Sequence, residues 1–519
     1  MSAVSRPFAL RESRGRPLPA AAVILWSAFA AFAVYLLAGS ALDDFFVTYR
    51  YALNLAEGHG FVYNPGERVL GLTNPGLGLL LAGLYLLTGL EIPWMATAIF
   101  AFGLLGFVLL LLREGLHRGR GIEAFLGGTL VLVSTYIWIC HGGAASMVLL
   151  LLVAAATLAG RAPTGAGTVA GLAVWCRPEA LLGVLLLGLL RWREGRRVPW
   201  IYAFTASTII GLGALWAWAY FGTVLPITLE SKQLLAELGN NNSGGIDFWS
   251  EARPLWRRHG GILALEIVVI GLAGQVFVLR HGGRGAKLLC LYGLALALAY
   301  PLLGVPFFSW YTVPVAAAIL YGAAYFAIHF GRILGRWIGE SEGGPWIGRV
   351  QDGPRIGFAV SVALVTLVLF SFGERNWRIF QNYSWHHRME LYHEAAEWIR
   401  ENSAATDEVS SLEIGVVGFY SRRPLQDLLG MVTPRALPFV AEKNIQGVLR
   451  NHPTELLLRY NHGGRFDGLF KTRWFRRNYR LAHSVANTDE SHVVRIYRRK
   501  KAPGRSRASR AAPAQGGSS

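Results

Sequence analysis

Long apolar runs recur through this chain, and they constrain its fold more than any other feature. An apolar run of about 20 residues can cross the roughly 30 Å core of a bilayer as a helix. With 53% hydrophobic and 16% charged residues among 519, the composition is typical of a polytopic membrane protein. We expect about 11 transmembrane helices. In chain order, the runs are Ala20–Gly39, Ile92–Leu112, Ile122–Ile139, Ala145–Ala159, Ala166–Cys176, Ala180–Leu190, Val198–Phe221, Ile262–Leu279, Leu288–Val305, Tyr311–Phe330 and Ile356–Phe372.

The basic residues indicate how these helices are oriented. The formal net charge of +18 is concentrated in short clusters between the runs and in the last residues, which indicates topology rather than nucleic-acid binding. The apolar stretch Gly76–Gly89 is short for a crossing, so we place it at the outer face. The clusters at 113–120, 191–197, 280–287 and 331–337 then all lie in the cytoplasm, as does the basic leader 1–19.

Polar and aromatic residues from distant parts of the chain meet at the outer face in this topology. They are the loop 40–91 with its adjacent acids, the RPE at 177–179, the loop 220–260 and the FFSWY at 307–311. Ionisable groups beside a membrane are costly, which suggests a site. An equally common explanation is that helix-end aromatics and charges anchor the protein at the interface.

A soluble pattern begins after residue 373. Residues 389–402 have the spacing of a helix with one apolar face, and 408–413, 453–460 and 491–500 are typical of strands. We expect a small α/β domain over 373–500, which is extracytoplasmic because the number of spans is odd. The tail 501–519 is expected to be disordered. The three cysteines lie in apolar runs and show no disulfide or zinc spacing.

The stretch DDFFVTYRYALNLAEGHGFVYNPGERVLGLTNP, residues 43–75, resembles the first outer loop of GT-C membrane glycosyltransferases. It is particularly similar to the group that includes the mycobacterial terminal arabinofuranosyltransferase. CRPEALL, YFGTVLPITLESK and SLEIGVVGFYSRRPLQDLLGMVTP resemble further elements of that family, so the resemblance covers most of the chain. It implies a GT-C-like transmembrane domain over 20–372, with the motif in the loop 40–91.

The resemblance also implies a reaction. A polyprenyl-phosphate-linked sugar would be the donor and a glycan, lipid or protein the acceptor, usually with inversion at the anomeric carbon. The site would lie at the extracytoplasmic face of a bacterial inner membrane. The protein would cross that membrane several times and have a cytoplasmic N-terminus. No nucleic acid is expected as a partner and no cofactor is certain. A divalent cation is left open.

The residues of the first loop fit this chemistry. A carboxylate that removes the acceptor proton contributes typically 10² to 10⁴-fold, and Asp43 or Asp44 is the natural base. Adjacent acids on a helix or strand cannot both face one substrate. We favour Asp43 slightly, because the resemblance implies that the leading acid is the catalytic one. Arg50, Arg177 and Lys232 are candidates to stabilise the departing lipid phosphate. Alternatively, Arg50 pairs with one of the acids and only holds the loop.

Further polar and aromatic residues of the predicted outer face are candidates for substrate binding. They are His59, Asn64, Glu67, Arg68, Glu179, Trp310 and Tyr311. His59 could bind phosphate or a metal, although a single histidine is more often a hydrogen-bonded structural residue. Glu179 could instead neutralise the arginine two positions before it. The two aromatics could stack on sugar or anchor the protein at the interface.

The chain departs from the family pattern at several positions. Ala145 stands where relatives often carry an acid, Leu70 and Leu72 replace Glu and Tyr, and Ile227 replaces Asn. These changes indicate a different sugar or acceptor from the arabinose enzymes, or a weakened catalyst. The rival classes are a transporter and a noncatalytic protein of cell-envelope glycan assembly. A transporter would place its charges near the midplane of two repeats. The acids are present, so we rank an enzyme first. The sequence has no Walker-type phosphate loop, which argues against an ATP-driven pump.

Overall fold

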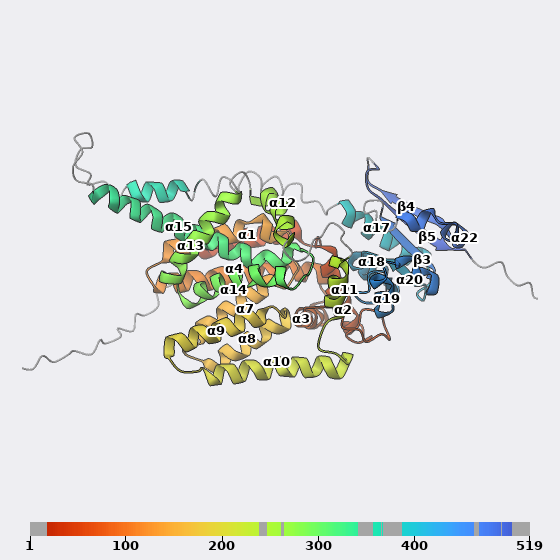
Figure 1. Cartoon of the computed structure of the whole chain (residues 1–519), viewed down its shortest axis with the longest axis horizontal. Coiled ribbons are helices and arrows are strands. Elements are labelled where there is room, and N and C mark those ends of the chain that lie inside the picture. Colours follow the sequence, from red (N-terminus) through yellow and green to blue (C-terminus); the bar gives the residue numbers. More distant parts are fainter. Residues whose placement is uncertain are drawn as a thin grey trace, which may run out of the picture.

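The computed structural model describes residues 18–237, 247–260, 264–340, 356–364, 366, 387–460, 467–488 and 490–500. Three regions on which expectations were placed lie outside these residues, namely most of the basic leader, the stretch 367–386 and the tail 501–519. The described chain has a large helical part, coloured red to green in Figure 1, and a smaller C-terminal part in blue that contains a sheet.

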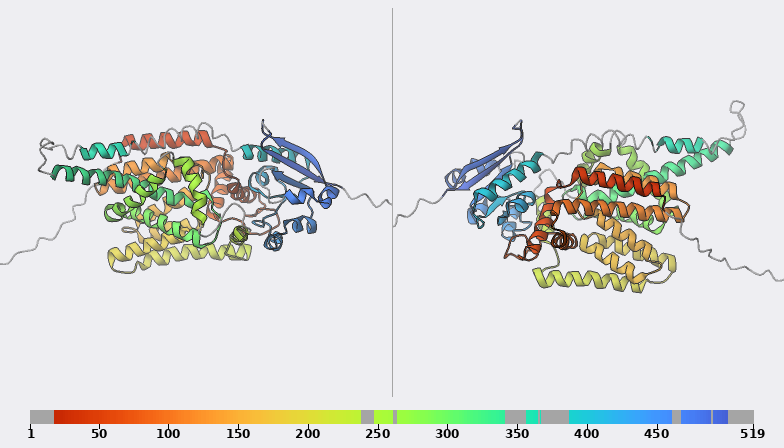
Figure 2. Two further views of the ribbon diagram at one scale, coloured as in Figure 1. Left: turned by 45° about the horizontal axis from the view of Figure 1, so that its top comes forward. Right: turned by 180° about the vertical axis from the view of Figure 1, so that it is seen from behind.

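The apolar runs form helices that lie roughly side by side in the large part (Figures 1 and 2). Each helix falls on a predicted run. Most ends differ by a few residues, but α15 continues past the predicted end at Phe330 as far as Glu340. In chain order they are α1 (Ala20–Leu37), α4 (Ile92–His117), α5 (Gly121–Val133), α7 (Ala145–Leu158), α8 (Pro163–Cys176), α9 (Ala180–Gly195), α10 (Trp200–Phe221), α13 (Ala264–His281), α14 (Arg284–Leu302), α15 (Val313–Glu340) and the helical residues 356–364.

Only some of these helices are long enough to span a bilayer by length and composition. In the described part of the chain there are five: α1, α4, α10, α14 and the stretch Ser309–Trp337, which joins the short helix η2 (Ser309–Thr312) to α15. The predicted run Ile122–Ile139 is interrupted at Ser134, where α5 ends and the short α6 (Thr135–Trp138) begins. The count of about 11 spans therefore stays a prediction.

Four further helices belong to the two predicted outer loops. They are α2 (Asp43–Ala56), α3 (Pro75–Thr88), α11 (Ile227–Glu237) and α12 (Phe248–Gly260). Helix α2 begins with two acids, which complement the positive end of the helix dipole. It ends just before Gly58, whose φ of 84° is accessible to glycine at little cost. Nearly all of α2 is buried, because it lies between the bundle and the C-terminal part.

The C-terminal part is built on a five-stranded sheet of order β2-β1-β3-β5-β4. Strand β1 is parallel to β2 and β3, and β5 is antiparallel to β3 and β4. The predicted helix and three strands are present, while β2 and β4 were not predicted. That this part is a separate extracytoplasmic domain stays a prediction. Its elements are α17 (His387–Asn402), β1 (Val409–Ser411), α18 (Gly415–Ser421), β2 (Leu425–Asp427), η3 (Pro434–Ala436), α19 (Leu437–Ala441), α20 (Ile445–Asn451), β3 (Leu456–Tyr460), α21 (Asp467–Lys471), α22 (Arg473–Asn478), β4 (Tyr479–Ala486) and β5 (Val493–Arg499).

Helix α18 joins the two parts by packing directly on α2. Two glycines make this approach close: a Cβ added at Gly415 would collide with the backbone carbonyl of Asp43, and one at Gly418 would collide with the Tyr63 hydroxyl. Phe46 of α2 packs edge-on against Phe419 of α18, with ring centroids 5.6 Å apart. The first predicted outer loop is therefore held by the C-terminal part.

Candidate active site

A small cavity lies where α2, α11, η2 and the C-terminal part meet, and we call it the junction cavity. Its volume is about 60 Å³. Charged, hydroxylic and aromatic side chains line it together with the chain at 71–74. The lining residues are Asp44, Phe45, Val47, Thr48, Gly71, Leu72, Thr73, Asn74, Arg177, Thr228, Lys232, Trp310 and Met431.

The two adjacent acids of α2 have different environments. Successive residues of an α-helix point about 100° apart, so only one of them can face the junction cavity. That residue is Asp44, which is half-buried and has no hydrogen bond or ion pair within the described residues. Asp43 points toward α18, where its two carboxylate oxygens accept the backbone N–H groups of Gly415 at 2.9 Å and Val416 at 2.8 Å.

The environment of Asp43 also changes its acidity. The carboxyl group is 4% exposed, and burial is the main factor that raises its pKa from 3.8 to about 7. The negative charge of Glu413 adds to this effect. The two backbone N–H donors favour the ionised form, but they only partly offset burial.

Lys232 of α11 brings a positive charge to the junction cavity. Its ammonium group lies over the rings of Phe308, Trp310 and Tyr311, with Nζ at 4.4, 5.5 and 5.7 Å from the ring centroids. Such cation–π contacts stabilise the charge without neutralising it. No acidic partner of Lys232 is found among the residues that the structure describes. The charge therefore stays available to an anion.

Arg177 lines the same cavity but is partly neutralised. Its Nε donates to Glu179, and the Tyr300 hydroxyl donates to the same carboxylate oxygen at 2.9 Å. The guanidinium also lies 5.6 Å from the centroid of the Tyr311 ring. Glu179 and Tyr311 thus position Arg177, and neither of the two lines the cavity itself.

Arg50 does not reach the junction cavity. Its guanidinium is buried and donates to the backbone carbonyls of Tyr63 at 2.7 Å, Arg423 at 2.7 Å and Gly418. Burial lowers the pKa of Arg50, and the neighbouring tyrosines partly offset that effect. These contacts favour the alternative in which Arg50 only holds the loop. Its partners are backbone carbonyl groups and not one of the two acids.

The other residues of the first loop that were predicted to bind substrate also lie outside the cavity. Asn64 is buried, and its side-chain amide exchanges two hydrogen bonds with the backbone of Leu425, at 2.9 and 3.0 Å. It therefore fixes the start of β2. His59, Glu67 and Arg68 are exposed, and Arg68 lies over a tyrosine ring of α10. Their predicted part in substrate binding has no support from this placement.

Several residues of the site were not singled out from the sequence. Thr228 is 7% exposed, lines the junction cavity and has a hydroxyl oxygen without a hydrogen-bond partner in the described structure. The Thr48 hydroxyl donates to Asn74 at 2.8 Å. The only available signal was that Thr228 lies four residues before Lys232 in the YFGTVLPITLESK stretch, on the same face of a helix.

The C-terminal part contributes Met431 to the cavity wall. The loop that carries it is held by Asp427, whose carboxylate accepts backbone N–H groups of Leu429 at 2.8 Å and Val432 at 3.2 Å. Burial raises the pKa of Asp427 to about 7 despite these donors. Asp427 lies in the QDLLGMVTP segment, but nothing in its spacing marks it as a loop organiser.

The junction cavity combines a proton acceptor with an anion-binding group. Asp44 can accept a proton, Lys232 and Arg177 can stabilise negative charge, and Trp310 offers a ring face. Within the described residues, no group of three or more histidine, cysteine, aspartate or glutamate side chains is placed to hold a metal ion. The question of a divalent cation stays open.

The chain was compared with protein-family models, curated proteins and solved structures. Residues 376–501 match the model of a domain of unknown function, DUF8728. No curated protein matches the sequence. Among solved structures, the chain is similar to ArnT from Cupriavidus metallidurans in the apo state, with a TM-score of 0.54 and 13% identity over 91% of this chain and 97% of that one.

Two other solved structures are similar. ArnT from Cupriavidus metallidurans bound to undecaprenyl phosphate has a TM-score of 0.52 and 14% identity over the same shares, 91% and 97%. The Archaeoglobus fulgidus oligosaccharyltransferase in complex with Zn and sulfate has a TM-score of 0.50 and 12% identity over 84% of this chain and 67% of that one. These proteins are GT-C glycosyltransferases, and the chain shares their fold, with five described helices long and apolar enough to cross a membrane.

Proposed function

We propose that this protein is a membrane glycosyltransferase that transfers a sugar from a polyprenyl-phosphate donor to an acceptor hydroxyl. The observation that carries the proposal is the junction cavity, where the Asp44 carboxylate and the Lys232 ammonium line one space and neither is in an ion pair with a described residue. The fold supports it, because the similar structures include ArnT with undecaprenyl phosphate bound. The narrower likeness to arabinofuranosyltransferases stays a prediction, as do the sugar and the acceptor.

The geometry favours Asp44 over Asp43 as the base. The acceptor hydroxyl would give its proton to the Asp44 carboxylate while its oxygen forms a bond to the anomeric carbon. Both oxygens of Asp43 are occupied by backbone donors of α18, which leaves that side chain a positioning role. Because the bond to phosphate breaks on the opposite side of the anomeric carbon, such a displacement inverts its configuration.

The leaving group fits the cationic side of the cavity. As the bond between the anomeric carbon and the phosphate oxygen breaks, the lipid phosphate gains negative charge. Lys232 would stabilise it as a point charge, and Arg177 would contribute the guanidinium N–H groups that Glu179 does not occupy. The orphan hydroxyl of Thr228 could donate to the same phosphate. With the topology predicted above, this site opens at the outer membrane face.

The test is sugar transfer by purified protein supplied with a panel of polyprenyl-phosphate sugars. We expect Asp44→Asn to lower kcat by about 10² to 10⁴-fold, since the amide cannot accept the proton. Lys232→Gln should lower kcat and raise KM, because the positive charge contacts donor and leaving group. Glu67→Gln is the control: it removes an exposed carboxylate of the same loop, outside the cavity, and should leave the rate unchanged.

Three outcomes would contradict the proposal. Full transfer activity in Asp44→Asn would exclude Asp44 as the base, and the proposed mechanism of proton removal from the acceptor would then be wrong. Uptake of a solute into proteoliposomes without any sugar transfer would favour the transporter class instead. A lack of transfer by the wild type with every donor would support the noncatalytic alternative.

A further inference from the structure

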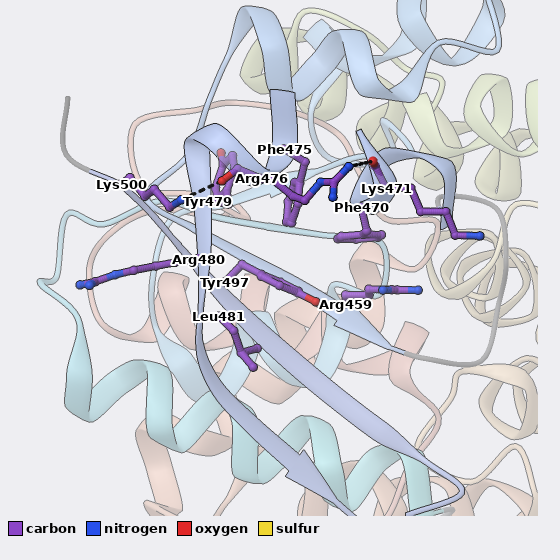
Figure 3. Close-up of a pocket in the computed structure, with 10 residues that line it drawn as sticks. All are labelled: Arg459, Phe470, Lys471, Phe475, Arg476, Tyr479, Arg480, Leu481, Tyr497 and Lys500. Carbon is purple, nitrogen blue, oxygen red and sulfur yellow. Dashed lines mark hydrogen bonds between the residues drawn. The ribbon is translucent and has the colours of Figure 1, made fainter. Parts of the chain in front are cut away.

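A second and larger cavity opens on the C-terminal part, far from the junction cavity. Its volume is about 390 Å³, and β3, α21, α22, β4 and β5 contribute to its lining, along with Lys500 just beyond β5 (Figure 3). We call it the distal cavity, because Figure 1 shows β4, β5 and α22 at the end of the molecule farthest from the helix bundle. Nothing in the proposed transfer reaction uses it.

The charge of the distal cavity is entirely positive. Five of its lining residues are cationic, and none of the lining residues, which all lie in the described chain, is acidic. These cations are Arg459, Lys471, Arg476, Arg480 and Lys500. Some arginines elsewhere on this part of the protein are paired with acids, as in the ion pairs Arg422–Glu57 and Arg435–Glu408. Like charges that line one cavity repel one another, so an anion would stabilise them.

Hydrogen bonds hold two of these cations in place and leave most of their donors unused. Arg476 donates to the backbone carbonyl of Lys471 at 3.1 Å, and Lys500 donates to that of Arg476 at 2.7 Å. Figure 3 draws both bonds. The side chains of Lys471 and Arg480 are exposed and make no hydrogen bond or ion pair within the described residues.

Aromatic rings form the apolar surface between the cations. They are Phe470, Phe475, Tyr479 and Tyr497. Phe475 and Tyr479 are buried, whereas Phe470 and Tyr497 are half-buried and stack with centroids 5.7 Å apart. In Figure 3 these two rings lie between Arg459 and Lys471 on one side and Arg480 and Lys500 on the other. A ring face beside cations suits a ligand with both an apolar face and an acidic group.

We propose that the distal cavity binds an anionic carbohydrate, a sugar unit that carries a carboxylate or phosphate group. The Arg459 guanidinium already lies 4.1 Å from the centroid of the Phe470 ring. The pyranose face would therefore pack on the Tyr497 ring beside it, and the acidic group would contact Arg480, Lys471 and Lys500. The headgroups of the protein's own bilayer fit less well, because the cavity lies at the end away from the bundle. The proposal concerns binding alone and does not depend on the transfer reaction.

Binding can be measured with the full-length protein in nanodiscs of zwitterionic lipid, by calorimetric titration with oligogalacturonate. The fully methyl-esterified oligosaccharide is the matched ligand without charge. We expect the acid form to bind at least about tenfold more tightly than the ester, and its affinity to fall as salt screens the charges. This comparison needs no variant, so it does not depend on how a mutant folds.

A charge-matched pair of variants locates the site. Lys471→Gln/Arg480→Gln removes two cations of the cavity and should weaken binding by about fivefold or more, whereas Arg473→Gln/Arg477→Gln removes two exposed charges of α22 outside it and should change affinity less than about twofold. Equal affinity for acid and ester, or equal losses in both double variants, would overturn the proposal. So would tighter binding of short-chain phosphatidylglycerol or inorganic phosphate than of the oligosaccharide, which would assign the site to a lipid headgroup or a free anion.

Discussion

At the scale of single residues, the adjacent acids of α2 show what a sequence can and cannot predict about a site. Helical geometry alone predicts that Asp43 and Asp44 cannot share one substrate. Which of them faces the cavity depends on the partner of the other. That partner is the backbone at Gly415 and Val416, more than 370 positions away. No local pattern around residue 43 contains this information, so the choice between the two acids could not be made from the sequence and stays a prediction.

The raised pKa of Asp43 predicts a pH-dependent stability. The folded protein holds this proton up to about pH 7, whereas the unfolded chain releases it near the ordinary value of 3.8. The free energy of unfolding should therefore decrease as pH rises from about 4 to about 7, by up to about 1.4 kcal/mol per pH unit, and level off above that. Asp43→Asn has no such proton and lacks this contribution.

Thermal unfolding of wild type and Asp43→Asn in the same detergent, between pH 4 and pH 9, measures the effect. The Tm advantage of the wild type should shrink up to about pH 7 and then stay constant. Subtracting the Tm of the variant from that of the wild type at each pH cancels the contribution of Asp427, whose pKa is raised in the same way. Parallel curves across the whole range would show that Asp43 does not titrate differently in the two states.

At the scale of elements, α18 is the piece that connects the C-terminal part to the site. It has only seven residues, and it lies against α2 because Gly415 and Gly418 leave room for the backbone of α2 and the Tyr63 ring. Arg50 and Asn64 complete the contact with hydrogen bonds to carbonyl groups and to β2. Arg50 and Asn64 therefore act by positioning an element rather than by touching the cavity.

Gly415→Ala tests this contact. The added methyl group would collide with the carbonyl of Asp43, so α18 must move away from α2. We expect a loss of several degrees in Tm and at least a tenfold loss in transfer rate, because a displacement of about 1 Å can cost about 10²-fold. Gly83→Ala in α3 is the control, since its Cβ meets nothing within 4 Å and alanine is the better helix former. Similar behaviour of the two variants would argue against the contact.

Strands and helices were predictable where their patterns are long. The apolar face of 389–402 predicted α17, which spans His387–Asn402, and three strands lie in the segments expected for them. Strand β2 has only three residues, which is too short to show a pattern. Along β4, buried and exposed side chains do not alternate, so the segment shows no period of two. Both strands are defined by pairing with a strand next to them in the chain, β1 for β2 and β5 for β4, and the pattern within each segment does not show that pairing.

At the scale of the whole molecule, the sequence predicted a polytopic helical protein of GT-C type, and the similar solved structures support that fold. The number of spans could not be settled from hydropathy. Helices α5 and α7 have 13 and 14 residues, fewer than a straight crossing needs. Their neighbours bury much of their surface, so composition does not distinguish a crossing from a buried core helix.

The predicted orientation can be tested by labelling. The native cysteines Cys140, Cys176 and Cys290 are buried, so the background should be low. Positions 67 and 196 are both exposed, the first in the loop 40–91 and the second in a basic cluster. A membrane-impermeant maleimide should label Glu67→Cys in intact cells and Arg196→Cys only after the membrane is opened. The opposite pattern would invert the topology and place the junction cavity on the cytoplasmic side.

The small size of the junction cavity limits which ligands can bind in it. About 60 Å³ leaves room for a few water molecules, which is far less than a sugar phosphate occupies. A donor of the proposed kind would therefore fit only if the cavity widened. Lys232 and Trp310 are part of its wall and make ring contacts, and widening the cavity at either residue would cost those contacts.

The contact between α18 and α2 has a consequence for genetics. Asp43 and Asp44 are neighbours on one rigid helix, so a shift of the C-terminal part through Asp43 also re-aims Asp44. Alleles that abolish the proposed activity should then map to residues such as Gly415 and Gly418 as readily as to the cavity itself. Suppressors of such alleles would be found across the contact, on α2, rather than in the chain that carries the lesion.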